Sequence, residues 1–235
     1  MLIISRILPK SEVSMPTKTI KQKKTPRIAK TLKILKTTYP NVKTQLSYKT
    51  PFELLVATIL SAQCTDKQVN GVTKILFQTL NTPDDFAGAP IETIEKLIRP
   101  TGFFHNKAKN IKRCALALLE KYHGDVPNTL DELVKLPGVG RKTANCVLGA
   151  AFGTPGIVVD THVARISQRL GLTQNKDPVK IEFDLMEIIP KKEWNVFSLR
   201  LIYHGRAVCK ARKPACLSCP LKELCCYFEK LPQSF

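Results

Sequence analysis

Acidic residues are scarce in this chain. Of its 235 residues, 37 are lysine or arginine and 19 are aspartate or glutamate, which gives a formal net charge of +18. Such an excess of positive charge attracts phosphate groups regardless of their sequence context. The composition therefore favours an anionic partner, although basicity alone does not distinguish DNA from RNA or from an anionic membrane.

The chain also lacks long apolar runs, alternating strand patterns and internal repeats. Without a long apolar run, a membrane-spanning protein is disfavoured. Without alternating patterns a sheet is disfavoured, and without repeats a repeat array is disfavoured. Instead, apolar residues recur at helical spacing, and 43% hydrophobic residues supply enough material for a sizeable core. We expect an all-α protein of one or two domains, with helices around residues 51–59, 69–80, 91–97, 106–122, 130–136, 141–148, 163–170, 177–188 and 194–201.

No convincing secretory signal precedes the cysteines, so a disulfide framework is disfavoured. Four of the eight cysteines lie near the C-terminus and are separated by six, two and five residues: Cys209, Cys216, Cys219 and Cys225. Four thiolates can hold a [4Fe–4S] cluster or a zinc ion. Structural zinc sites usually combine two short C-x₂₋₄-C motifs. Only one such motif, formed by Cys216 and Cys219, is present here, so the spacing favours the cluster without excluding zinc. The others are interpreted as buried thiols in a reducing compartment: Cys64, Cys114, Cys146 and Cys226.

Residues 136–144, LPGVGRKTA, contain a Gly-x-Gly turn that leads into a predicted helix. A capping-box pattern from Thr129 to Glu132 predicts a short helix before the turn, so the segment is a helix-hairpin-helix. Such a unit binds the DNA backbone through main-chain amides and reads no bases. Lys142 would lie in the first helical turn, where the helix dipole favours a neutral, nucleophilic amine. The alternative is a solvated lysine on a helix face, which this motif disfavours.

Residues 157–162, IVVDTH, place Asp160 just before a predicted helix marked by Val163, Ile166 and Leu170. A carboxylate there can stabilise the positive charge that develops when a lysine attacks a sugar carbon. The alternative is that Asp160 only caps the helix. The two roles are compatible, because a capping carboxylate is held in a fixed direction. His162 is expected to be structural. A phosphate-binding hairpin, a lysine and a carboxylate are the parts of an enzyme that excises DNA bases.

Four motifs together resemble the endonuclease III family. They are the hairpin LPGVGRKTA, the run VDTH at 159–162, the C-x6-C-x2-C-x5-C loop, and the run SAQCTD at 61–66. The resemblance covers roughly residues 28–228. It implies a base-excision-repair enzyme that releases oxidised pyrimidines from double-stranded DNA. It also implies cleavage 3′ to the abasic site by β-elimination through a lysine Schiff base.

The resemblance also assigns residues to roles. Lys142 would be the nucleophile and Asp160 the catalytic carboxylate. Gln63 would fill the space left by the extruded base, and Phe103 would be the wedge, although the family often has leucine there and core packing is the alternative. The remaining DNA contacts are expected in the hairpin, at Gly138, Val139, Gly140 and Arg141, and in the cluster loop, at Lys210, Arg212 and Lys213.

The implied architecture has two helical lobes with the DNA between them. A six-helix lobe would span residues 44–154, and a cluster lobe would combine residues 28–43 with 155–228, followed by a tail at 229–235. Residues 1–27, which carry one acid, Glu12, among many bases, are expected to be a disordered basic arm. A targeting segment, or a true start at Met15, are the alternatives for this region.

Two other functions compete with this prediction. An adenine glycosylase of the same superfamily would lack the nucleophilic lysine, so Lys142 argues against it. A non-catalytic DNA-binding scaffold would not need both Lys142 and Asp160. We expect a monomer with a [4Fe–4S] cluster, acting on the nucleoid in the cytoplasm, or in the nucleus or an organelle of a eukaryote.

Overall fold

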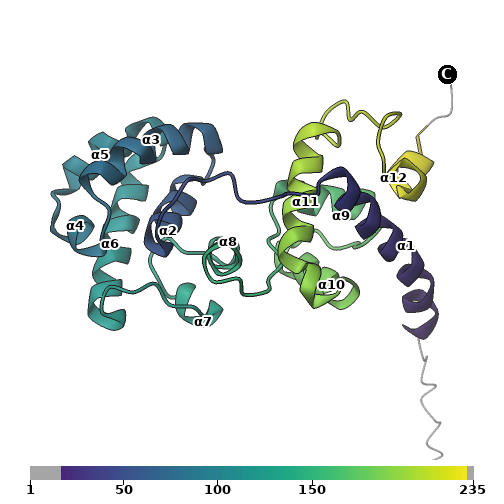
Figure 1. Cartoon of the computed structure of the whole chain (residues 1–235), viewed down its shortest axis with the longest axis horizontal. Coiled ribbons are helices and arrows are strands. Elements are labelled where there is room, and N and C mark those ends of the chain that lie inside the picture. The colour runs from purple at the N-terminus through teal and green to yellow at the C-terminus, as the bar shows by residue number, and fades with distance from the viewer. Residues whose placement is uncertain (1–16, 232–235) are drawn as a thin grey trace, which may run out of the picture.

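The computed structural model describes residues 17–231, with side chains from Pro26 onward, and all regular elements in that range are helices. The helices form two lobes that lie side by side along the long axis of the molecule (Figure 1). Each lobe has a hydrophobic core of its own. The all-α, two-lobed fold expected from the sequence is therefore confirmed.

The first lobe is built around one helix that is buried on every side, α2 (Pro51–Leu60). All its residues from Phe52 to Leu60 are buried, as expected for a predominantly apolar helix. Thr50 caps it by accepting a hydrogen bond from the main-chain N of Glu53 at 3.1 Å. The other elements surround α2: α3 (Asp66–Thr79), α4 (Pro83–Gly88), α5 (Ile91–Ile98), η1 (Arg99–Thr101), α6 (Phe104–Tyr122), α7 (Leu130–Leu133) and α8 (Arg141–Ala151).

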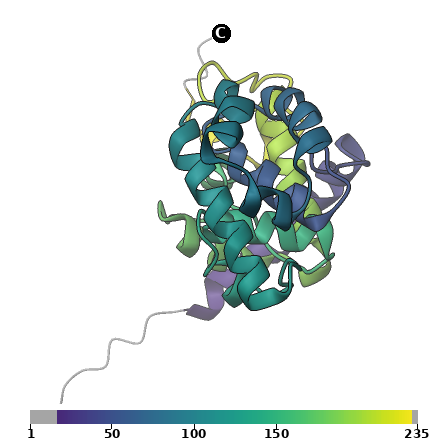
Figure 2. The same ribbon diagram turned by 90° about the vertical axis from the view of Figure 1, so that its left-hand side faces the viewer.

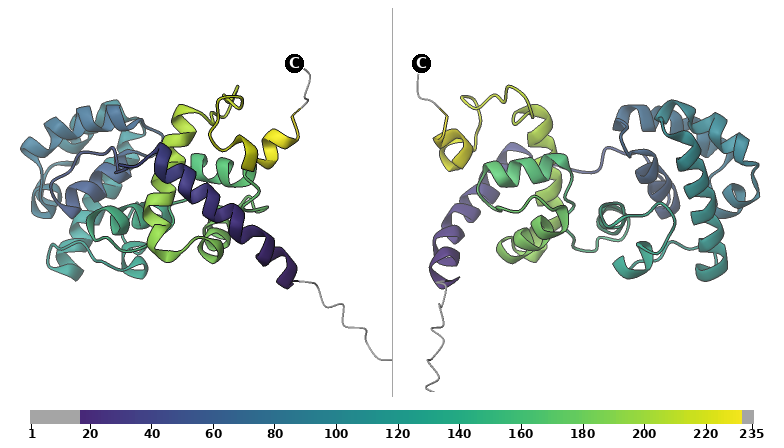
Figure 3. Two further views of the ribbon diagram at one scale, coloured as in Figure 1. Left: turned by 45° about the vertical axis from the view of Figure 1, so that its right-hand side comes forward. Right: turned by 180° about the vertical axis from the view of Figure 1, so that it is seen from behind.

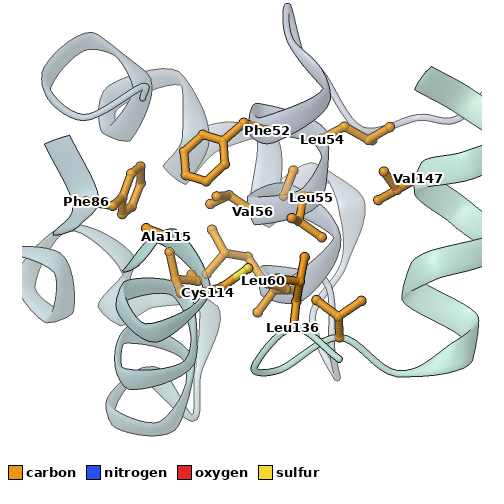
Figure 4. Packing of buried hydrophobic residues seen from close by; sticks show 14 of the residues in the cluster. Phe52, Leu54, Leu55, Val56, Leu60, Phe86, Cys114, Ala115, Leu136 and Val147 are labelled. Atoms are coloured by element: carbon orange, nitrogen blue, oxygen red, sulfur yellow. The ribbon is translucent and has the colours of Figure 1, made fainter. Parts of the chain in front are cut away.

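Side chains from four of these helices meet in the core of the first lobe (Figure 4). Phe52 on α2 packs edge to face against Phe86 on α4, with ring centroids 5.5 Å apart. Leu55 and Leu60 are fully buried between α6 and α8. Replacing such a leucine by alanine would cost roughly 2–5 kcal/mol. This core holds the hairpin between α7 and α8 on a rigid base.

The first lobe has seven α-helices where six were predicted, because α4 was not among the predicted helices. This helix has six residues and one buried apolar side chain, Phe86, so it shows no periodicity. Its signal is local: Thr82 and Asp85 form a reciprocal capping box around Pro83. The start of α6 was also misplaced. Asn106 was expected to cap it, but the helix begins at Phe104 without a side-chain cap.

The second lobe brings the first helix together with the C-terminal third of the chain. Long helix α1 (Thr17–Thr38) lies across α10 and α11 on the outside of the lobe (Figure 3). In the end-on view the first lobe stands in front of the second (Figure 2). The remaining elements are α9 (Thr161–Arg169), α10 (Pro178–Ile188), η2 (Lys191–Glu193), α11 (Trp194–Ala207), η3 (Lys222–Leu224) and α12 (Cys226–Glu229).

The expected disorder of residues 1–27 is wrong for its C-terminal part, because α1 already begins at Thr17. Arg27 connects this helix to the cluster loop, because its guanidinium donates a hydrogen bond to the main-chain O of Leu224. The basic residues at positions 1–16, the alternative start at Met15 and the tail from 232 onward lie outside the described residues. The remaining domain boundaries stay predictions.

Candidate active site and cluster loop

The hairpin between α7 and α8 needs glycine at position 138. Gly138 has a φ of +78°, and a Cβ there would lie 2.8 Å from Cβ of Asn110 on α6. Val139 donates its N–H to the main-chain O of Leu136 at 3.1 Å, and its side chain is buried. The hairpin is thus fixed from within, and Val139 can offer DNA only its main chain.

Neither backbone conformation nor packing requires glycine at position 140, in contrast to position 138. The φ of Gly140 is −86°, and a Cβ would meet no atom within 4 Å, so the fold itself would accept a side chain. The first helical hydrogen bond of α8 is donated by Ala144 to the O of Gly140. The N–H groups of Arg141 and Lys142 therefore have no intrahelical partner. Open space beside free N–H groups at a helix N-terminus suits a phosphate.

Lys142 and Asp160 line the same cavity, which has a volume of about 430 Å³. Its walls come from both lobes: the connecting segment at 42–46, α2, α8 and α11. Small-molecule sites usually occupy roughly 300–1,000 Å³, so there is room for an extruded nucleotide. Lys142 is exposed, and in the described part of the chain it forms no ion pair. Its amine is therefore free to react.

Asp160 caps α9 as predicted, and one of its oxygens does all the capping. Oδ1 accepts hydrogen bonds from the main-chain N of His162 and of Val163, each at 2.8 Å. Oδ2 accepts no hydrogen bond from residues 17–231. Because Asp160 also lines the cavity, its fixed carboxylate keeps one oxygen available for chemistry. Capping and catalysis are compatible here.

The charges of Lys142 and Asp160 both affect the thiol of Cys146 on α8. Burial raises the pKa of its thiol, Lys142 opposes the shift, and Asp160 and Asp66 add to it. Asp66 is the last residue of the SAQCTD run at 61–66, and no role was predicted for it from the sequence. Its Oδ2 lies 2.7 Å from Nη2 of Arg206, which also lines the cavity. This ion pair joins α3 to α11. The sequence could not predict Arg206 as a residue of this cavity, because it belongs to none of the motifs and lies far from the hairpin along the chain.

His162 is structural, as expected. Its Nδ1 lies 3.0 Å from Nη2 of Arg165, and a Cβ on Gly205 would come within 2.5 Å of the same nitrogen. Burial lowers the pKa of His162, and Asp160 opposes that shift. Gly205 thus allows α9 and α11 to pack closely behind the capping aspartate.

Cys209, Cys216, Cys219 and Cys225 line one small cavity in the C-terminal loop. Within residues 17–231 no three His, Cys, Asp or Glu side chains converge closely enough to hold a single ion. Four cysteines around one cavity suit a cubane, with one iron per thiolate. Burial and the neighbouring thiols raise the pKa of Cys219 to about 11, against a main-chain hydrogen bond at Leu221.

Other side chains support the loop. Arg169 donates from Nη1 to Sγ of Cys209 at 3.2 Å, and Nε2 of His204 lies 3.5 Å from Sγ of Cys219. Cys226 does not line the cluster cavity; its Sγ accepts from Nη2 of Arg27 at 3.0 Å. Cys226 is thus set apart from the ligands, as the spacing predicted.

Comparison with known proteins agrees with this geometry. The profile of the HhH-GPD superfamily base excision DNA repair proteins matches residues 56–191, and that of the iron-sulfur binding domain of endonuclease III matches residues 209–225. Endonuclease III of Synechocystis sp. is 54% identical over 200 residues, covering 85% of this chain and 91% of the relative. The chain belongs to the endonuclease III family.

Two further comparisons cover nearly the whole fold. Endonuclease III of Bacillus subtilis is 51% identical over 188 residues, covering 80% of this chain and 86% of the relative. A solved non-covalent endonuclease III–DNA complex matches with a TM-score of 0.84 at 48% identity, covering 89% of this chain and 97% of that one. A trapped endonuclease III–DNA covalent intermediate matches with a TM-score of 0.83 at 47% identity, with 89% and 97% coverage.

Membership of the endonuclease III family establishes the general function. The protein is a bifunctional DNA glycosylase and abasic-site lyase of base excision repair, and its C-terminal loop carries a [4Fe–4S] cluster. The zinc, adenine-glycosylase and scaffold alternatives are thereby set aside. No helix in the described part of the chain is both long and apolar enough to cross a membrane.

Gln63 and Phe103 share an unusual backbone conformation. Both are non-glycine residues in the left-handed region, with φ of 53° and 49°, and both are exposed. The side chain of Phe103 is 65% exposed, so the core-packing alternative for it is wrong. Strained, exposed residues of this kind gather at functional sites. Lys213 in the cluster loop has the same conformation, with φ of 48°, and its neighbours Lys210 and Arg212 are also exposed.

The guanidinium of Arg141 forms hydrogen bonds within the protein. Its Nε and Nη2 donate to the two carboxylate oxygens of Glu182 on α10, at 2.7 and 2.9 Å. The Glu182 side chain is 4% exposed and also accepts from Nδ2 of Asn145 at 3.1 Å. The hydrogen bond to Glu182 raises the pKa of Arg141. This ion pair joins the two lobes, and it leaves the predicted DNA contact at Arg141 to the main-chain N–H.

Proposed function

We propose that Lys142 is the nucleophile of this endonuclease III homologue. Its neutral Nζ would attack C1′ of the damaged nucleotide, and the bond from C1′ to the base would break. Loss of the amine proton and opening of the C1′–O4′ bond would leave an imine between lysine and sugar. Removal of a C2′ proton would then expel the 3′ phosphate, and water would hydrolyse the imine. The exposed, unpaired amine of Lys142 supports this role.

Asp160 would stabilise the positive charge on the sugar through its free Oδ2, or accept a proton there. The target base is inaccessible inside a duplex, so it must be extruded into the cavity. The observation that carries the proposal is that Lys142 and Asp160, held on different elements, line one cavity between the lobes.

The DNA would be held from three sides. Main-chain N–H groups of the hairpin, at Gly138, Gly140 and Arg141, would bind one phosphate, and Val139, whose N–H donates to Leu136, would hold the turn against the DNA backbone. Gln63 and Phe103 would enter the duplex where the base leaves. Lys210, Arg212 and Lys213 would bind phosphates farther along, and the cluster would hold their loop in shape.

Oxidised pyrimidines are the proposed substrates, because the motifs of this chain are those of endonuclease III. A monomer contains every proposed site residue, so no second copy is required. We place its action on the nucleoid, where its substrate is.

The decisive experiment is borohydride trapping of the imine. Wild type should crosslink to a duplex that carries an oxidised pyrimidine. Lys142→Gln should bind DNA without crosslinking, because the hairpin amides remain. Asp160→Asn should keep the cap through its side-chain oxygen and lose roughly 10²–10⁴-fold in rate.

Lys43 provides the matched comparison, since it also is an exposed lysine that lines the cavity. Lys43→Gln should crosslink like wild type. A full crosslink with Lys142→Gln, or none with Lys43→Gln, would move the nucleophile to another lysine. Adenine release without a lysine-dependent crosslink would instead identify an adenine glycosylase, and no base release would identify a scaffold.

A further inference from the structure

Lys107 on α6 is a buried lysine without an acidic partner. It is 5% exposed, and in the described part of the chain no carboxylate pairs with it. Its Nζ donates to two main-chain oxygens, those of Leu60 and Thr101, each at 2.9 Å. Burial lowers the pKa of Lys107, and Cys64 opposes the shift. An unpaired buried charge is costly, so its position requires an explanation.

Both acceptors are the ends of helices. Leu60 is the last residue of α2, and Thr101 is the last residue of η1. Helix C-termini have unsatisfied carbonyl groups and a partial negative charge. One ammonium group therefore satisfies two helix ends that are far apart in sequence, which accounts for a buried lysine without a carboxylate.

Each of these ends leads directly into a left-handed residue at the DNA-facing site. Gln63 follows Leu60 by three residues, and Phe103 follows Thr101 by two. The main-chain N of Lys107 also donates to the O of Phe103 at 3.1 Å. Two segments that come from different parts of the chain are thus fixed to one residue. Through these three hydrogen bonds Lys107 connects the segment that leads to Gln63 with the segment that contains Phe103.

We propose that Lys107 is a positioning residue for base extrusion, which sets the distance between Gln63 and Phe103 so that both enter the duplex together. This inference rests on the proposed roles of Gln63 and Phe103. Lys107 touches neither the cavity nor the reacting atoms, so it is expected to affect the extrusion step and to leave the attack by Lys142 unchanged.

Lys112 offers a matched control on the same helix. Its Nζ also donates to two main-chain oxygens, those of Ala87 and Ala89. These belong to α4 and the residue after it, where no DNA contact is proposed. Lys107→Met and Lys112→Met each remove an ammonium group that ties α6 to a neighbouring helix end. They differ in burial, since Lys107 is buried and Lys112 half-buried, and in what the tied segments carry.

The experiment compares three steps in full-length protein with its cluster bound. Base release is measured in single turnover on a duplex that carries an oxidised pyrimidine. Extrusion is followed by the fluorescence of 2-aminopurine opposite the lesion. Borohydride crosslinking is measured on a single-stranded oligonucleotide with an abasic site, where no base has to leave a stack. Wild type must crosslink in this last assay, and its failure to do so would contradict the proposed function, not the role of Lys107.

Lys107→Met should slow extrusion and base release by about 10- to 100-fold, as a misplacement of about 1 Å can do. Crosslinking to the single strand should stay within about threefold of wild type, and Lys112→Met should change neither rate by more than that. Equal losses in all three assays, or none, would overturn the proposal, because Lys107 would then support only the fold.

Combining Lys107→Met with substitutions at Gln63 and Phe103 gives a second readout, which a purely structural role of Lys107 would not change. If Lys107 acts through Gln63 and Phe103, Lys107→Met should add no further loss of base release to the variant Gln63→Ala/Phe103→Ala. Additive losses would contradict the inference. Should Lys107→Met not fold, Lys107→Arg keeps a buried cation and changes only the geometry of the two hydrogen bonds. It should show the same selective loss to a smaller degree, and base release at the wild-type rate would refute the proposal.

Discussion

Replacing Arg141 by methionine should destabilise the protein and leave the salt dependence of DNA binding unchanged. The substitution leaves the carboxylate of Glu182, which is 4% exposed, without its charged partner. Breaking a buried ion pair by removing one member costs roughly 3–5 kcal/mol. The Arg141 side chain is 34% exposed, and Asn145 still donates to Glu182, so we expect a value below that range, about 2–3 kcal/mol.

The assay combines urea unfolding with DNA binding at several salt concentrations. The double variant Arg141→Met/Glu182→Gln should recover part of the lost stability, because no buried carboxylate is left unpaired. Lys135→Met removes an exposed cation close to the same hairpin and should hardly change stability. A phosphate contact contributes about 0.9 to the salt slope. A slope that falls by that amount while stability is unchanged would refute the ion-pair interpretation and make the Arg141 guanidinium a phosphate contact.

Four other outcomes are expected. Cys216→Ser should lose the brown cluster, about four irons per chain in wild type, and unfold the second lobe earlier in thermal melts. Gly138→Ala should weaken DNA binding in a gel-shift titration, because of its positive φ and the contact with Asn110. Deleting residues 1–26 should flatten the salt dependence of binding without changing the single-turnover rate, since no proposed catalytic group is removed. Arg27→Met should speed loss of the cluster in air, measured by absorbance, because the bond to Leu224 is lost.

The parts of the site that could be predicted depend on short stretches of sequence. The Gly-x-Gly turn, the lysine after it and the capping aspartate each have a local physical reason, and the structure places Lys142 and Asp160 on one cavity. The cysteine spacing is local too, and the four residues surround one space. The roles of individual residues remain predictions that the proposed experiments test.

The misplaced elements show where local patterns are weak. Helix α4 is too short to display a period, so its capping box was its only signal. The start of α6 was assigned to Asn106 because asparagine caps well, yet the chain turns at Phe103 in a left-handed conformation. Such a conformation is rare for a bulky residue, and no propensity would predict it. Contacts made elsewhere, including those of Lys107, must hold it in place.

The cations show most clearly what sequence patterns cannot provide. A positive charge in a basic chain is assigned to solvent or to DNA, yet Arg141 pairs with Glu182, 41 positions away, and Lys107 reaches Leu60, 47 positions away. Arg200 is likewise 5% exposed and donates to Glu193 at 3.0 Å. These cations stabilise the protein and are not free to neutralise phosphate. The count of 37 lysine and arginine residues therefore overstates the number of cations available to DNA, and part of the basic character of this chain fixes the two lobes and the segments that would enter the duplex.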